Sequence, residues 1–184
     1  PTPFIEVGGD YCLDDPVQMP VASVGPTGGV FSGPGVTDNG DGMTFSFNPM
    51  TAGIGTITVT YTVTNTNGCS GSDMGFLTVN GPPNVGFTAP FDLCVTDGLQ
   101  SSVSGGTPPE GSATGDMGLY AGPGVTDDGN GVTYNFDPAA AGVGIHTLSY
   151  TYTDENGCSA TAMDDVEVFA SPNVTFTALA DLCV

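Results

Sequence analysis

The chain contains no lysine and no arginine among its 184 residues, whereas 20 residues are acidic, so its formal net charge is −20. Binding to nucleic acids requires cations that neutralise phosphate, so the composition excludes it. The same argument excludes attraction to an anionic membrane. Without a cationic partner, the carboxylates are left as solvated surface charges or as ligands for a divalent metal.

Long hydrophobic runs and tryptophan are absent as well. No segment approaches the roughly 18 apolar residues of a membrane span. The hydrophobic share of 39% and the mean hydropathy of +0.10 still suffice for small cores. The 29 glycines and 15 prolines fall between periodic segments, so they indicate turns.

The sequence repeats itself. Gly33–Val79 aligns without a gap to Gly122–Val168, and both segments begin with GPGVTD. Self-similarity at a fixed offset is typical of tandem modules. We predict one module at 1–82, a second at 83–171, and the first strand of a third at 172–184, as in a window from a longer array.

Within each module the hydrophobic period is two. In the first, Ile57, Val59, Tyr61 and Val63 alternate with threonines, which predicts a half-buried strand. Further short strands are expected at Phe4–Val7, Val17–Val24, Val30–Ser32 and Met43–Phe47. About seven short strands per module and no helical segment predict an all-β fold of tandem Ig-like antiparallel β-sandwiches.

Five cysteines follow the repeat. Cys12, Cys94 and Cys183 share one repeat position, and Cys69 and Cys158 share another. We expect one disulfide per module, Cys12–Cys69 and Cys94–Cys158, with Cys183 pairing in the next module. Each bond would stabilise its module by about 4 kcal/mol in the chain-entropy account, and disulfides indicate an oxidising, extracellular setting.

Two equivalent loops, TDNGDG and TDDGNG, are rich in acidic residues and glycine. Oxygen ligands on a tight glycine loop suit Ca²⁺, although the spacing differs from an EF-hand. We favour plain turns as the explanation of such loops, because glycine and asparagine supply positive φ there. The candidate calcium ligands are Asp38, Asp41, Asp127, Asp128 and Asn130. No cofactor is required, and calcium binding is left open.

No catalytic constellation can be assembled. His146 is the only histidine and occupies the inward strand position that matches Ile57, so we expect a packed or edge-strand histidine. The first module has no histidine, which excludes a triad repeated in both modules. We therefore expect that the chain is not an enzyme.

Two features favour ligand binding as an alternative. Thr56, Thr58, Thr60 and Thr62 form a regular outward stripe, which is one way to bind ice or a glycan. The second module also has an additional Gly/Pro-rich stretch, Gly105–Gly118, which is a longer surface loop or a recognition loop.

The shared residues resemble a known family. GPGV, the FNPMTAGIG and FDPAAAGVG segments, Tyr61, Tyr150 and the two NGC motifs are similar to the Ig-like (PKD-like) tandem repeats of large cell-surface proteins and gliding-type adhesins of Bacteroidota. The resemblance implies secretion by the type IX system, an extracellular location at the cell surface, and a structural or adhesive role with no catalytic residue.

The leading hypothesis is a rigid, disulfide-stapled spacer in an extracellular fibre or adhesin. Its partners would be neighbouring Ig-like repeats of the same long chain and other surface proteins or glycans. A third hypothesis is a self-assembling filament subunit that exchanges a strand.

Overall fold

The computed structural model describes residues 1–176, and these fall into two compact units. Unit 1 comprises Pro1–Asn84 together with two segments of the second repeat, Ala113–Asp116 and Thr153–Ala160. Unit 2 holds the rest of the second repeat. The additional loop and the hairpin of the second repeat therefore each contribute a segment to unit 1. The repeat-based boundaries at 82 and 171 stay a prediction.

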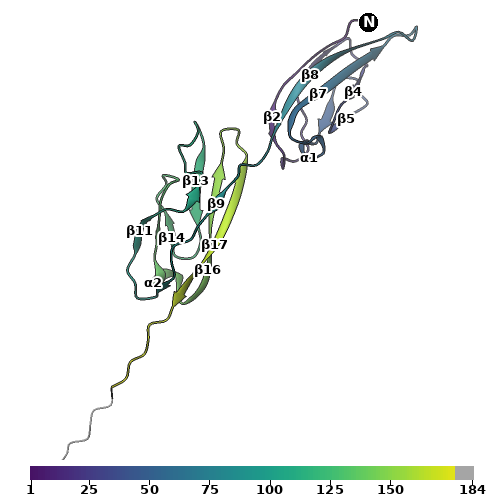
Figure 1. Ribbon diagram of the computed structural model, residues 1–184. Helices are drawn as coiled ribbons and strands as arrows, with labels where there is room; N and C mark the ends of the chain where they lie inside the picture. Colours follow the sequence, from purple (N-terminus) through teal and green to yellow (C-terminus); the bar gives the residue numbers. More distant parts are fainter. Residues whose placement is uncertain (177–184) are drawn as a thin grey trace, which may run out of the picture. The chain divides into compact units, whose positions relative to one another are not determined.

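Unit 1 is built from short strands around one long hairpin (Figure 1). Its strands are β1 (Phe4–Val7), β2 (Asp10–Cys12), β3 (Ala22–Gly25), β4 (Val30–Ser32), β5 (Val36–Asp38), β6 (Phe45–Phe47), β7 (Gly55–Thr64) and β8 (Ser70–Asn80). One sheet has the order β2-β8-β7-β4, in which β2 runs parallel to β8. The pairs β1-β3 and β5-β6 complete the sandwich.

Unit 2 repeats this arrangement. Its strands are β9 (Gly86–Phe87), β10 (Leu93–Cys94), β11 (Gln100–Val103), β12 (Gly106–Thr107), β13 (Met117–Ala121), β14 (Val125–Asp127), β15 (Tyr134–Phe136), β16 (Gly144–Thr153) and β17 (Ser159–Phe169). The adjoining ends of β16 and β17 fall in the segment 153–160 that belongs to unit 1. The sheet β10-β17-β16-β13 corresponds to β2-β8-β7-β4, and β11-β15-β14 and β12-β9 form the other layer. The predicted all-β, Ig-like fold is confirmed.

The long strands β7 and β8 show why the sequence adopts this fold. Along β7, the apolar side chains are buried and the threonines between them are exposed or half-buried. The core of unit 1 comprises ten buried residues: Ile5, Phe31, Phe45, Phe47, Ile57, Val59, Tyr61, Val63, Leu77 and Val79. Burying such side chains contributes about 1.5–3 kcal/mol each, so the core supports the sandwich without any ion pair that involves lysine or arginine.

Each repeat also contains one helical turn, so the prediction of no helical segment is wrong. These are α1 (Pro49–Ala52) and α2 (Pro138–Ala141). Asn48 and Asp137 cap the N-termini, proline occupies the first turn, and the capping Gly53 and Gly142 have φ of 84° and 85°. Asn/Asp-Pro-x-x-Ala-Gly is a start-and-stop signal for a helix, and it occupies only six residues between long segments of strand periodicity.

Two buried tyrosines connect the long strands to loops. The Tyr61 hydroxyl accepts a hydrogen bond from the Gly29 N–H at 2.9 Å and lies 2.8 Å from the Pro26 carbonyl oxygen. The Tyr150 hydroxyl lies 2.7 Å from the Pro108 carbonyl oxygen. Both rings are fully buried, so these contacts fix loop backbone against the core.

No helix within residues 1–176 has the length and apolar character of a membrane span.

Candidate functional site

The cysteines form one disulfide that crosses from the first repeat to the second. Cys12 is bonded to Cys158, with an S–S distance of 2.02 Å and a Cα–Cα distance of 5.4 Å. Cys69 and Cys94 are free thiols. The predicted pairs Cys12–Cys69 and Cys94–Cys158 are therefore wrong, and Cys183 lies outside the described residues.

Strand length explains why no bond forms within a repeat. Cys12 lies opposite Asn80, at the last residue of β8, whereas Cys69 lies just before its first residue. At about 3.3 Å per residue, the 11 residues of β8 separate the two cysteines by roughly 36 Å. A disulfide requires Cα atoms about 4.4–6.8 Å apart. Cys94 and Cys158 are separated in the same way by β17.

Each bonded cysteine is held in place by hydrogen bonds of its own backbone. We call the set around Cys12 the strand frame and the set around Cys158 the hairpin frame. The Cys12 N–H donates to Asp15 Oδ2 at 2.8 Å, and the next residue, Leu13, donates its N–H to the Asn80 carbonyl. The Cys158 N–H donates to Asp154 Oδ1 at 2.9 Å in a turn that Gly157 closes with φ 83°. Cys12 and Cys158 are only 8% and 1% exposed, so the bond is shielded from reductants.

The acidic loop of the first repeat forms a hydrogen-bonded turn. Asp38 accepts hydrogen bonds from the Phe31 and Gly40 N–H groups. Asp41 accepts from the Thr44 hydroxyl at 2.6 Å and from the N–H groups of Met43 and Thr44. The Thr44 hydroxyl and these N–H groups lower the pKa of the Asp41 carboxyl.

The loop of the second repeat has the same character. Asp127 accepts from the N–H groups of Tyr120 and Gly129. Asp128 accepts from the Thr133 hydroxyl and the Asn135 amide, and Asn130 accepts from the Val132 and Thr133 N–H groups. Across residues 1–176, no group of three or more His, Cys, Asp or Glu side chains is arranged to hold a metal. These bonds account for the loops as turns, and calcium at them stays a prediction.

The threonine stripe lies on a mixed surface. Thr56 is exposed, and Thr58, Thr60 and Thr62 are half-buried. Across the β7–β8 ladder, Thr58 and Thr60 lie opposite Phe76 and Met74, which are 55% and 56% exposed. The stripe is therefore bordered by exposed apolar side chains and is not a continuous threonine array.

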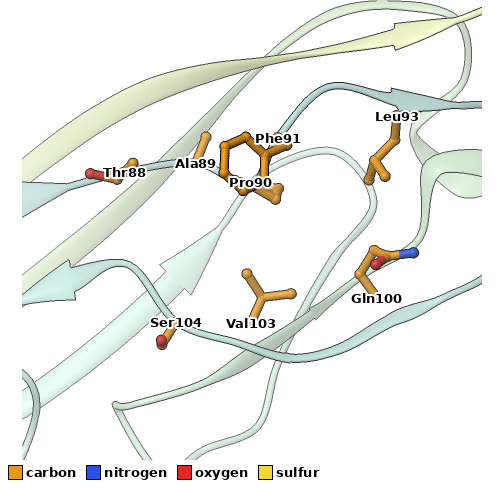
Figure 2. Close-up of a pocket in the computed structure, with 8 residues that line it drawn as sticks. All are labelled: Thr88, Ala89, Pro90, Phe91, Leu93, Gln100, Val103 and Ser104. Atoms are coloured by element: carbon orange, nitrogen blue, oxygen red, sulfur yellow. The ribbon is translucent and has the colours of Figure 1, made fainter.

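Unit 2 contains a hollow of about 360 Å³. Phe91 and Pro90 lie on one side of it, and Val103 and Ser104 on the other (Figure 2). The corresponding place in unit 1 is lined by Glu6, Val7, Gly8, Val21 and Ser23. The predicted recognition loop Gly105–Gly118 contributes no residue to either lining. Its Glu110 instead accepts a hydrogen bond from the Gly118 N–H at 3.1 Å.

His146 does not belong to a catalytic arrangement in the part of the chain that the structure describes. Its side chain is half-buried on β16, and Nε2 lies 2.7 Å from the Gly142 carbonyl oxygen at the end of α2. This contact packs the ring against the helical turn.

No family model and no curated protein matches the chain. Among solved structures, it is similar to the fibronectin(III)-like modules of Clostridium thermocellum CbhA, with a TM-score of 0.40 and 15% identity over 95% of this chain and 100% of that one. It is also similar to human protocadherin-24 EC1-2, with a TM-score of 0.38 and 12% identity over 92% of this chain and 99% of that one. For the insect immune protein hemolin, the TM-score is 0.37 and the identity is 14% over 91% of this chain and 46% of that one. The strand pairing within each unit shows the Ig-like fold.

Proposed function

We propose that the chain is a structural spacer of an extracellular fibre or adhesin, built from tandem Ig-like repeats and covalently locked across neighbouring repeats. The observation that carries this proposal is the Cys12–Cys158 bond, which spans 146 residues and joins residues of two different repeats. Stable disulfides are typical of oxidising compartments, which supports a location outside the cell. The resemblance of the repeats supports a cell-surface protein of the Bacteroidota type, exported by type IX secretion.

The bond determines how such a spacer bears tension. When the chain is pulled from points outside Cys12 and Cys158, the force passes through the disulfide and bypasses the residues between them. Those residues cannot extend until the bond is cleaved. The spacer would therefore keep its length under load even where a sandwich loosens. Its uniform negative charge would keep neighbouring fibres soluble and apart.

Single-molecule pulling on the ends of the chain tests the proposal. In oxidising buffer, the contour length should increase only by the residues outside the bond. After reduction, the increase should grow by on the order of 500 Å, because 146 residues then extend at about 3.4 Å each. Equal extension with and without reductant would contradict the spacer mechanism.

A ligand-binding module remains the second hypothesis, and a non-enzymatic role is common to both. The hollow beside Phe91 is the feature that favours it, because apolar hollows with a few polar groups are usual ligand sites. Binding on a glycan array or to ice, abolished by Phe91→Ala or by substitutions in the Thr56–Thr62 stripe, would support this role. The absence of binding would contradict the ligand-binding hypothesis and leave the structural spacer as the proposed function.

A further inference from the structure

The two free cysteines occupy the same repeat positions as the two bonded ones. Cys94 is the second-repeat counterpart of Cys12, and Cys69 is the first-repeat counterpart of Cys158. Cys69 is exposed and Cys94 is half-buried. One bonded pair and one free pair in a single chain allow the two states of each position to be compared directly.

The strand frame is the same with and without the bond. The Cys94 N–H donates to Asp97 Oδ2 at 2.8 Å, as the Cys12 N–H does to Asp15 Oδ2 at 2.8 Å. The N–H of the residue after Cys94 donates to the carbonyl of Phe169, the residue opposite Cys94. The first repeat makes the same contact to Asn80. The frame at Cys94 is thus preformed.

The hairpin frame is also preserved. The Cys69 N–H donates to Asn65 Oδ1 at 2.9 Å, and the Asn65 N–H donates to the Cys69 carbonyl at 2.9 Å. Asp154 makes both contacts to Cys158, each at 2.9 Å. Gly68 and Gly157 close the two turns with φ of 78° and 83°. Cys69 is therefore presented by the same turn as its bonded counterpart.

From these matched frames, we infer that Cys94 and Cys69 are the two halves of a second bond of the same kind, made between copies of this chain. Cys94 of one copy bonds to Cys69 of the next, which continues the Cys12–Cys158 pattern along an array. The contact is heterologous and head-to-tail, so it extends a row of copies instead of closing a dimer. The inference rests on the proposed spacer function, for which it names the partner surface.

The chemistry requires an oxidant, and a small disulfide such as oxidised glutathione supplies it. The Cys69 thiolate attacks the glutathione disulfide, forms a mixed disulfide and releases one glutathione thiol. The Cys94 thiolate of the neighbouring copy then attacks the Cys69 sulfur and releases the second. Two protein thiols are oxidised to one disulfide, and one glutathione disulfide is reduced to two thiols.

Complementary variants of the full chain test the inference. Both carry Cys183→Ser, because Cys183 shares the repeat position of Cys94. One variant also carries Cys69→Ser and keeps Cys94, and the other carries Cys94→Ser and keeps Cys69. Each is incubated alone, and the two are mixed, at high concentration with oxidised and reduced glutathione. Non-reducing electrophoresis and mass spectrometry then identify the linked peptides.

We expect the mixture to form a dimer joined by Cys94 and Cys69, at least tenfold more abundant than the dimers of either variant alone. The Cys183→Ser chain with both thiols should form a ladder of oligomers. Equal dimer formation by the separate variants would indicate random oxidation and overturn the inference. A mixture that stays monomeric while both thiols become glutathionylated would also overturn it. In that case, a chain that still keeps its length under tension would retain the spacer function, so the two failures are distinguishable.

Discussion

The first and second repeats have the same sandwich and the same cysteine frames, yet each contributes only one cysteine to the bond. The first repeat uses its strand cysteine, Cys12, and the second uses its hairpin cysteine, Cys158. The counterparts Cys69 and Cys94 sit in the same turns and strands with free thiols. The comparison shows that each repeat positions its two cysteines in the same way but does not join them to each other in a disulfide. Pairing depends on a neighbouring repeat.

The largest expected effect on stability distinguishes the two hairpin cysteines, Cys158 and Cys69. Cys158→Ser removes the bond, and the chain-entropy account assigns about 5 kcal/mol of unfolding free energy to a loop of this length. Cys69→Ser alters the matched position where the thiol is free, so it should change stability by less than about 0.5 kcal/mol. Urea denaturation of both variants measures the difference. Equal losses would show that the hairpin positions contribute through packing alone.

A smaller effect is expected at the buried tyrosines. Tyr61→Phe leaves the Gly29 N–H and the Pro26 carbonyl without the hydroxyl that contacts them. Burying unpaired polar groups should cost about 1–3 kcal/mol. The urea midpoint of the variant measures this loss. No destabilisation would mean that water replaces the hydroxyl at the loop.

Tyr134→Phe should stabilise the chain, whereas Tyr61→Phe should destabilise it. Among the described residues, the buried Tyr134 hydroxyl has no hydrogen-bond partner, and the first repeat has Phe45 at the aligned position. Removing an unpaired buried hydroxyl should raise stability by about 1 kcal/mol. Thermal melts at pH 8 measure the gain. A loss of stability would contradict the assignment of this hydroxyl as unpaired.

The same variant should change the response to pH. Burial raises the pKa of Tyr134 to about 12, whereas an unfolded tyrosine titrates near 10. Between these values the unfolded chain has lost the proton and the folded chain has kept it, so stability falls as pH rises from about 10 to 12. Tyr134→Phe should therefore show a shallower loss of stability over this window than the unaltered chain.

Calcium should have the smallest effect. The oxygens of Asp38, Asp41, Asp127 and Asp128 accept hydrogen bonds from their own loops. We expect only a small change in Tm between EDTA and millimolar Ca²⁺. A shift above about 10 °C would show that the loops bind the ion strongly. Asp41→Asn and Asp128→Asn would then locate the site.

Much of the fold could be predicted from the sequence, because the alternation of apolar residues and threonine along Gly55–Thr64 follows directly from which side chains are buried. Strands Phe4–Val7 and Val30–Ser32 were predicted with the bounds that the structure gives. Strand periodicity does not predict the two helical turns, whose signal is the capping residue and proline at Asn48-Pro49 and Asp137-Pro138.

The cysteine pairing could not be predicted in the same way. Equal repeat positions suggested one bond per module, but the register of β2 against β8 places Cys12 at the far end of the strand from Cys69. Sequence spacing does not reveal which end of a long strand a short parallel strand joins.

Peptide mapping of the oxidised chain shows directly whether Cys12 is bonded to Cys158. Trypsin has no site in this sequence, so pepsin digestion at low pH, which suppresses thiol exchange, should precede mass spectrometry. The account predicts one dominant cross-linked species that joins the peptide of Cys12 to the peptide of Cys158, with Cys69 and Cys94 recovered as thiols in chains kept dilute. Peptides that join Cys12 to Cys69 and Cys94 to Cys158 would contradict it.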